Sequence, residues 1–120
     1  FIRIPIPPIG HGYAYEKLKR KIGDYATAAA AVVITMSNGY CQTASIGLTN
    51  LSEIPIWAEE AGKHLVGSTL DSASVRLAIA AAELIVDPAS DMRGPAEYRR
   101  KMAGVMLRRA IDRAKSRAQA

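Results

Sequence analysis

Polar and apolar residues alternate in the first part of the chain in the way expected of a half-buried β-strand. Within residues 13–20, Tyr13, Tyr15 and Lys17 fall on one side of an extended backbone, and Ala14 falls on the other. Successive side chains of a strand point to opposite faces, so one face of this segment carries aromatic rings and a cation. We therefore predict a strand here that presents two faces of different chemistry.

Two further strands are expected to follow as a hairpin. Residues 26–36 begin with alanines but end in the β-branched run 32–35, which favours a strand over a helix. Asn38 and Gly39 come next, and Asn-Gly between two apolar runs is the strongest short-range hairpin signal because both residues tolerate positive φ. Residues 40–49 alternate again, so the three strands are predicted to form an antiparallel meander.

Helical spacing of apolar residues dominates the rest of the chain. Pro55 marks the start of a first helix over 56–66. Asp71 or Ser72 is expected to be the N-cap of a second helix over 73–86. A third helix is predicted from residue 95 to about residue 117. Strands followed by helices indicate an α+β domain, with three helices packed on one face of a three-stranded meander.

The third helix has an apolar stripe that we expect to be buried, and arginines that we expect to stay in water. The stripe consists of Tyr98, Met102, Val105, Met106, Ala110 and Ala114. The residues expected on the solvent-exposed side of the helix are Arg99, Arg100, Lys101, Arg108 and Arg113. The two methionines are interpreted as core residues and not as part of a cofactor site.

The first 12 residues are expected to be an extended connector. Pro5, Pro7 and Pro8 restrict the backbone of this segment to β or polyproline geometry. The chain begins at Phe1 without an initiator methionine, so we expect a fragment of a longer polypeptide; removal of a short leader is the alternative. There is no signal-peptide pattern and no apolar run long enough for a membrane span.

The net charge of +5 is unevenly distributed. Of the 16 lysines and arginines, nine lie in residues 93–120 and four in residues 17–21. This asymmetry allows a small basic module that binds nucleic acid or an acidic protein. We favour a helix with a solvated basic face, because no aromatic array accompanies the C-terminal cations, and we expect no nucleic-acid partner.

Candidate metal ligands and nucleophiles are few. The two histidines, His11 and His64, are far apart and no carboxylate pattern links them, so no metal site is expected. A single cysteine, Cys41, excludes an internal disulfide and a cysteine-based metal site in this chain, and a cytoplasmic location is expected. No nucleophile elbow or dinucleotide fingerprint is present, so no catalytic residue is predicted.

Two polar segments remain as candidates for function. Residues 87–100 mix acidic and basic side chains, and we favour helix capping over a ligand site, with Arg93 and Arg99 bridging back to carboxylates. The stretch from Tyr13 to Asp24 combines aromatics and cations. It is either an edge strand protected by lysines or a surface that meets a ligand or another protein, and both readings stay open on the residues alone.

Several motifs resemble a known family over nearly the whole chain. They are Tyr15-Glu16-Lys17-Leu18, Asp24-Tyr25-Ala26, the boundary from Gly67 to Asp71, and the pattern D-x-R-G-x-x-x-Y-R in residues 91–109 with paired arginines after it. The chain resembles the C-terminal domain of the flavoprotein (medium) subunit of molybdenum hydroxylases. Within that family it looks most similar to the carbon monoxide dehydrogenase medium subunits.

The resemblance implies which part of a larger enzyme would hold each cofactor. Residues 1–12 would be the linker from an N-terminal FAD-binding domain that this chain lacks, and residues 13–120 would be the C-terminal domain. FAD would be held mainly by the missing domain. Partner subunits would carry [2Fe–2S] clusters and molybdopterin, and electrons would pass through FAD to an external acceptor. Carbon monoxide, a purine, an aldehyde and an N-heterocycle are all substrates that the resemblance allows.

Two site residues follow from the resemblance. Tyr15 matches the family position nearest the flavin ring, where an aromatic side chain can stack on the isoalloxazine. Lys17 is the next candidate, because a cation near the ring would favour the anionic reduced flavin. The domain itself is expected to cover the flavin and to perform no bond-making step.

Overall fold

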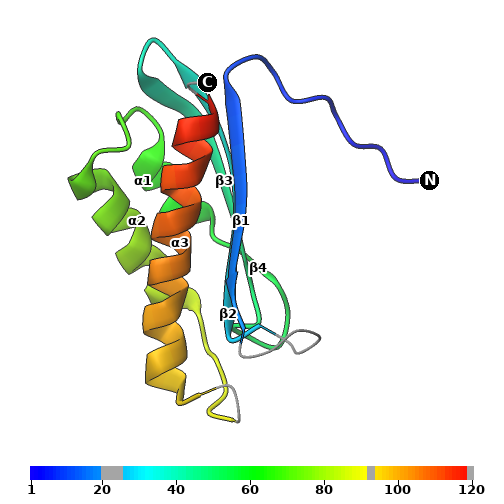
Figure 1. Ribbon diagram of the computed structural model, residues 1–120, viewed down its shortest axis with the longest axis vertical. Helices are drawn as coiled ribbons and strands as arrows, with labels where there is room; N and C mark the ends of the chain where they lie inside the picture. Colours follow the sequence, from blue (N-terminus) through cyan, green and yellow to red (C-terminus); the bar gives the residue numbers. More distant parts are fainter. Residues whose placement is uncertain (20–25, 92–93, 119–120) are drawn as a thin grey trace.

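A four-stranded antiparallel sheet with three helices on one face forms the body of the domain (Figure 1). The structure is a computed structural model, and it describes residues 1–19, 26–91 and 94–118. The strands follow the chain in the order β1-β2-β3-β4. The elements are β1 His11–Leu18, β2 Ala28–Ser37, β3 Tyr40–Thr49, β4 Ile56–Trp57, α1 Glu59–Leu65, α2 Ser72–Ile85 and α3 Ala96–Ala118. The α+β prediction is confirmed.

The hairpin between β2 and β3 forms where the Asn-Gly pair predicts it. Asn38 and Gly39 have φ angles of 54° and 81°, so both central residues occupy the left-handed region that such a turn requires. Ser37 pairs with Tyr40 across the turn, and a register shift follows between Thr35 and Met36. The predicted turn therefore sets the pairing next to it, and the irregularity that follows sets the register of the rest of the two strands.

The prediction of three strands was wrong, because the sheet has a fourth. Residues 56–57 were assigned to the start of a helix, but they pair with Leu48 and Gly47 of β3, and helix α1 begins only at Glu59. Pro55 restricts the residue before it to extended geometry, and Ile56 packs against the core while Trp57 points to the other face. Residues 56–57 pair with the free edge of β3, and the periodicity of the residues around them does not predict that pairing.

Small residues let helix α3 lie close to the sheet. Helix α3 packs on β1 and β2, α1 packs on β3, and α2 covers the gap between the other two helices. Ala28, Ala30 and Ala14 are fully buried beneath α3. A Cβ atom added to Gly12 would lie 1.8 Å from the Ala114 carbonyl oxygen, which shows how closely the helix backbone approaches the strand.

The buried face of α3 differs from the predicted stripe. Met106, Ala110 and Ala114 are buried as expected, but Leu107 and Ile111 complete the core in place of Tyr98, which is 46% exposed. Arg99, predicted to be solvated, is 5% exposed. The stripe was predicted from the spacing of apolar residues alone. That spacing cannot predict the burial of an arginine, because the hydrogen-bond partners that allow it lie in other parts of the chain.

The outer edges of the sheet are covered by backbone and side chains. On β3, beyond the short strand β4, the Cys41 amide donates to the Ser68 carbonyl at 2.8 Å, and the Gly67 amide donates to the Cys41 carbonyl at 2.7 Å. On β1, Arg117 donates to the Tyr13 carbonyl at 2.7 Å. Strand β1 and the part of β3 that β4 leaves unpaired thus each have neighbours that occupy some of their backbone groups.

Some predicted features fall outside the described residues. They are Arg20 and Lys21 of the basic run, the turn at Gly23 and Asp24, Tyr25 of the family motif, and Arg93. Among the helices that the structure does describe, none combines the length and the apolar character needed to cross a membrane.

Candidate functional site

Tyr15 and Lys17 lie together on the uncovered face of the sheet. Burial alternates along β1, so that Gly12 and Ala14 are buried beneath the helices while Tyr13, Tyr15 and Lys17 are exposed on the opposite side. The Lys17 ammonium nitrogen lies 5.8 Å from the centroid of the Tyr15 ring. The predicted two-faced strand is confirmed, and its open side presents an aromatic ring next to a cation.

A shallow row of residues crosses the sheet from Tyr15. In the strand register, Tyr15 pairs with Ala31, Ala31 with Gly47, and Gly47 with Trp57. No atom lies within 4 Å of the position that a Cβ would take on Gly47, so the middle of the row is open. Two aromatic side chains, both more than half exposed, therefore flank a floor of the two smallest residues.

Trp57 was not singled out from the sequence. It was interpreted as part of an apolar helix stripe, which hid its position on a strand. Its type carried a signal nonetheless: tryptophan occurs once in the chain, and this one is 67% exposed. A large aromatic residue in water often marks a contact surface.

Arginines of α3 occupy the outer side of β1. The Arg117 guanidinium lies over the Tyr13 ring at 4.5 Å, besides its hydrogen bond to the Tyr13 carbonyl. Arg113 forms an ion pair with Glu16 at 3.1 Å. Protection of this edge by the lysines of the strand was one of the two readings left open, and in the described residues Arg113 and Arg117 of α3 contact the edge as well. Tyr15 and Lys17 remain available on the open face.

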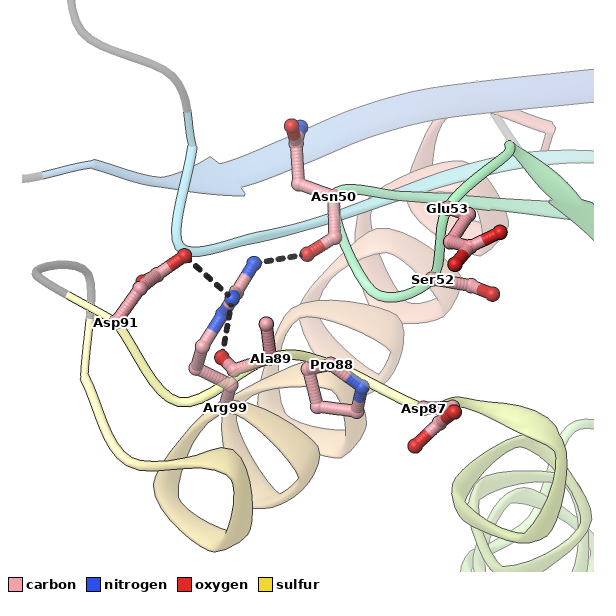
Figure 2. A pocket seen from close by; sticks show the side chains of 8 residues that line it. All are labelled: Asn50, Ser52, Glu53, Asp87, Pro88, Ala89, Asp91 and Arg99. Carbon is pink, nitrogen blue, oxygen red and sulfur yellow. Dashed lines mark hydrogen bonds and ion pairs between the residues drawn. The ribbon is translucent and has the colours of Figure 1, made fainter.

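The segment after α2 is held by Arg99. The guanidinium donates from Nε to the Thr27 carbonyl at 3.0 Å. It donates from Nη1 to the Ala89 carbonyl at 2.6 Å, a contact that Figure 2 shows. It also donates to the Asn50 carbonyl and forms an ion pair with Asp91 at 3.4 Å. One buried cation on α3 thus holds together the residue before β2, the residue after β3 and the segment that follows α2. These contacts support a structural role for residues 87–100.

A cavity of about 560 Å³ lies beside this arginine. Its lining consists of Asn50, Ser52, Glu53, Asp87, Pro88, Ala89, Asp91 and Arg99 (Figure 2). The one cationic group in this lining already donates to three backbone carbonyls, so it is not available to an anionic ligand. We therefore interpret the cavity as a by-product of the arginine's hydrogen bonds.

The basic cluster of the last helix is partly used within the domain. Arg99 is buried, Arg113 pairs with Glu16, and Arg117 binds the edge of β1. Arg100 lies 3.9 Å from Glu97. These contacts weaken the case for a continuous cationic surface of the kind that nucleic-acid binding requires.

Histidines and acidic residues form no metal centre in the part of the chain that the structure describes. No three side chains of His, Cys, Asp or Glu come together there in a way that would hold an ion. His11 Nδ1 donates instead to the Pro8 carbonyl at 2.9 Å, beside the start of β1.

Cys41 is a buried thiol, and we expect it to react slowly. Burial raises the pKa of the Cys41 thiol, and its Sγ donates to the Thr43 carbonyl at 3.2 Å. Only the thiolate is nucleophilic, so the raised pKa and the burial act in the same direction. With a thiol reagent at neutral pH, the native protein should react at least about tenfold more slowly than the protein in denaturant. Equal rates in the two states would contradict the buried position.

Comparison with known proteins assigns the fold to a flavoprotein class. The sequence profile described as the CO dehydrogenase flavoprotein C-terminal domain matches residues 13–114. The chain therefore belongs to the CO dehydrogenase flavoprotein C-terminal domain family.

Particular relatives agree with this assignment. The carbon monoxide dehydrogenase medium chain of Afipia carboxidovorans is 74% identical over 98% of this chain, which spans 41% of that relative. A solved structure, reconstituted CO dehydrogenase from Oligotropha carboxidovorans, superposes with a TM-score of 0.93 at 73% identity, covering 95% of this chain and 40% of that one. Carbon monoxide dehydrogenase from Hydrogenophaga pseudoflava, in a form that lacks the Mo-pyranopterin moiety of the molybdenum cofactor, gives 0.92 at 44% identity with the same coverage. The chain thus spans less than half the length of these relatives.

Proposed function

We propose that this chain is the C-terminal domain of the flavoprotein subunit of a carbon monoxide dehydrogenase-like oxidoreductase. The observation that carries the proposal is the 74% identity to a carbon monoxide dehydrogenase medium chain over 98% of this chain. More than half of that relative lies outside the matched region, so the FAD-binding domain is assigned to the remainder. Residues 1–12, of which the first nine are exposed, would be the linker to it.

In this proposal the domain acts inside a larger complex. An iron–sulfur subunit and a molybdopterin subunit would complete the enzyme, and electrons would pass from [2Fe–2S] clusters through FAD to an external acceptor. The H. pseudoflava relative was solved in a form that lacks the Mo-pyranopterin moiety of its molybdenum cofactor, and an enzyme that carries such a cofactor in its complete form supports a molybdenum-containing partner here. FAD would supply the redox step, and this chain would cover part of the flavin without making or breaking bonds.

The uncovered face of the sheet fits the role of one wall of a flavin site. An isoalloxazine ring is flat and aromatic, and the face offers the exposed Tyr15 ring with the Lys17 ammonium group 5.8 Å from its centroid. Phosphates are commonly held by a glycine-rich loop that leads into a helix N-terminus. The described helices here follow Ala58, Asp71 and Pro95 instead, so the pyrophosphate would be bound elsewhere.

Each of the two residues has a distinct task in this proposal. Tyr15 would stack on or gate one face of the ring, since offset aromatic contacts are favourable. Lys17 would stabilise negative charge on the reduced ring through Coulomb attraction, so it would raise the potential of the flavin.

Substitution of Tyr15 in the assembled parent enzyme tests the proposal. Stacking contributes about 0.5–1.5 kcal/mol, so Tyr15→Ala should weaken FAD binding by roughly twofold to tenfold. It should also alter the flavin absorption spectrum. Lys17→Met should lower the flavin potential, because the reduced anion loses a neighbouring cation. FAD content, spectrum, potential and the rate of flavin reduction are the measurements.

Tyr40 is the matched control. It is the same residue type with nearly the same exposure, 52% against 56%, but it lies at the β2–β3 turn. Tyr40→Ala should leave the flavin unchanged. If Tyr15→Ala behaves like Tyr40→Ala in binding, spectrum and rate, then Tyr15 does not belong to the site.

A further inference from the structure

We propose that the uncovered face of the sheet is the surface on which the FAD-binding part of the same subunit packs, with Val33 at its centre and Trp57 at its β4 edge. This inference rests on the proposed function, and it concerns contact between polypeptide segments in addition to contact with the flavin. Helices α1, α2 and α3 all lie on the other side of the sheet (Figure 1). No described helix therefore packs on this face, which α3 reaches through the Arg117 guanidinium over the Tyr13 ring.

The chemistry of this face is that of an interface core. Three neighbouring cross-strand rows form its central part, and their members are His11, Thr35 and Thr43; Tyr13, Val33 and Ser45; and Tyr15, Ala31, Gly47 and Trp57. None of these ten residues is Lys, Arg, Asp or Glu. Charge lies at the margin of the face, where Lys17 occupies the next row and the Arg117 guanidinium lies over the Tyr13 ring. Depletion of charge with enrichment of tyrosine and tryptophan is the composition that distinguishes the centre of a protein–protein interface.

The exposed apolar groups on the face are contiguous. Val33 is 47% exposed, and it neighbours Tyr13 on one side and the row from Tyr15 to Trp57 on the other. Single exposed apolar residues are ordinary, but a continuous patch marks a contact surface. We therefore expect another polypeptide segment to pack on this patch.

The shape of the patch suits a protein segment. Tyr15 and Trp57 stand at the two ends of a row whose middle positions are Ala31 and Gly47. Three inter-strand spacings separate the aromatic residues, which is about 14 Å. A helix with its side chains is about 10–12 Å across, so the trough is wide enough to receive one.

The occupant is inferred from the length and the course of the chain. The relatives carry more than half of their length outside the matched region, so each of them brings a large tethered body to this domain. The segment before β1 runs away from the helices, on the side of the open face (Figure 1). Its isoleucines are almost fully exposed, among them Ile2, Ile4 and Ile6. A tethered partner on that side would cover the segment and the face together, at a high effective concentration.

Thiol footprinting of the full-length flavoprotein subunit tests this surface. Val33→Cys places a thiol at the centre of the face, and Ser45→Cys places a second one on the neighbouring strand in case the first variant folds poorly. Leu84→Cys is the control, because Leu84 is 85% exposed on α2, on the far side of the domain. The rate of labelling with iodoacetamide is measured by mass spectrometry of the peptide that carries each cysteine. Each rate is expressed as a ratio to the rate of the same cysteine in denaturant.

Positions 33 and 45 should be labelled at least about tenfold more slowly than position 84, in the subunit without its partners and at every protein concentration. Rates within threefold of the control would overturn the inference. Protection that grows with protein concentration would assign the face to a second copy, and protection that needs the iron–sulfur or molybdenum subunit would assign it to that partner; either result also overturns it. FAD content of the assembled complex reports separately on the proposed function, since a complex without FAD can still have position 33 covered.

Discussion

Replacing Arg99 with methionine is expected to lower the free energy of unfolding by about 3–5 kcal/mol, the range found when one partner of a buried charged contact is removed. The guanidinium is 5% exposed and donates to carbonyls of Thr27, Ala89 and Asn50. Methionine fills much of the volume but donates nothing. Loss of the donor costs most at the Thr27 carbonyl, where the hydrogen bond is buried, and less at the part-buried Ala89 and Asn50 carbonyls, where water can take part of the donor's place.

Two further variants separate the causes of this loss. Arg99→Lys keeps the charge but lacks the planar fork, so it should recover only part of the stability. Arg113→Met removes an arginine of the same helix that is half exposed and paired with Glu16, and it should cost less than about 1 kcal/mol. Denaturant unfolding of the three variants gives the comparison. A loss below 1 kcal/mol for Arg99→Met would show that the guanidinium does not hold these segments together.

Gly12→Ala is expected to be the other severe change, with a loss of about 3 kcal/mol, the upper part of the range for overpacking. The added Cβ would lie 1.8 Å from the Ala114 carbonyl oxygen and 2.8 Å from the Ala118 Cβ. Backbone atoms cannot rotate aside as a flexible side chain can, so α3 would have to move away from β1. That movement would loosen the contacts of Leu107 and Ile111 with the alanines of β2.

Gly47→Ala is the matched control for that variant. Gly47 also lies within a strand, but nothing lies within 4 Å of its hypothetical Cβ. The added methyl should therefore be neutral, or slightly stabilising because it restricts the unfolded chain. Thermal or denaturant unfolding of both variants tests the difference. Equal stabilities would mean that α3 lies less close to β1 than the structure indicates.

The features that the sequence predicted correctly are encoded by neighbours along the chain. Asn38 and Gly39 specify their turn by their own backbone preferences, and the two faces of β1 follow from alternation. Of the two predicted N-cap candidates for α2, Asp71 and Ser72, Asp71 is the cap, since its carboxylate accepts from the Ser74 amide. In each of these cases the residues that decide the structure lie within a few positions of one another.

The features that were missed depend on partners far away in sequence. Arg99 is buried because it meets Thr27, which lies 72 positions earlier. Trp57 lies on a strand because β3 offers it an edge, so the helical spacing of its surroundings was misleading. The assignment of Tyr15 and Lys17 to a flavin contact came from family resemblance, and the structure adds that they share one exposed face. Whether they touch the flavin remains a prediction for the experiment above.

The way in which the two sheet edges are covered has a consequence for assembly. A sheet with a bare edge can accept a strand from another protein, and such strand addition recruits partners through backbone hydrogen bonds with little regard to side chains. Here Gly67 and Ser68 occupy the Cys41 backbone on one edge, and Arg117 occupies the Tyr13 carbonyl on the other. Strand addition is therefore hindered at these positions, whereas contacts on the broad face of the sheet depend on which side chains are present there. We expect a domain built in this way to be recognised more through the side chains of its open face than through pairing with these parts of its edges.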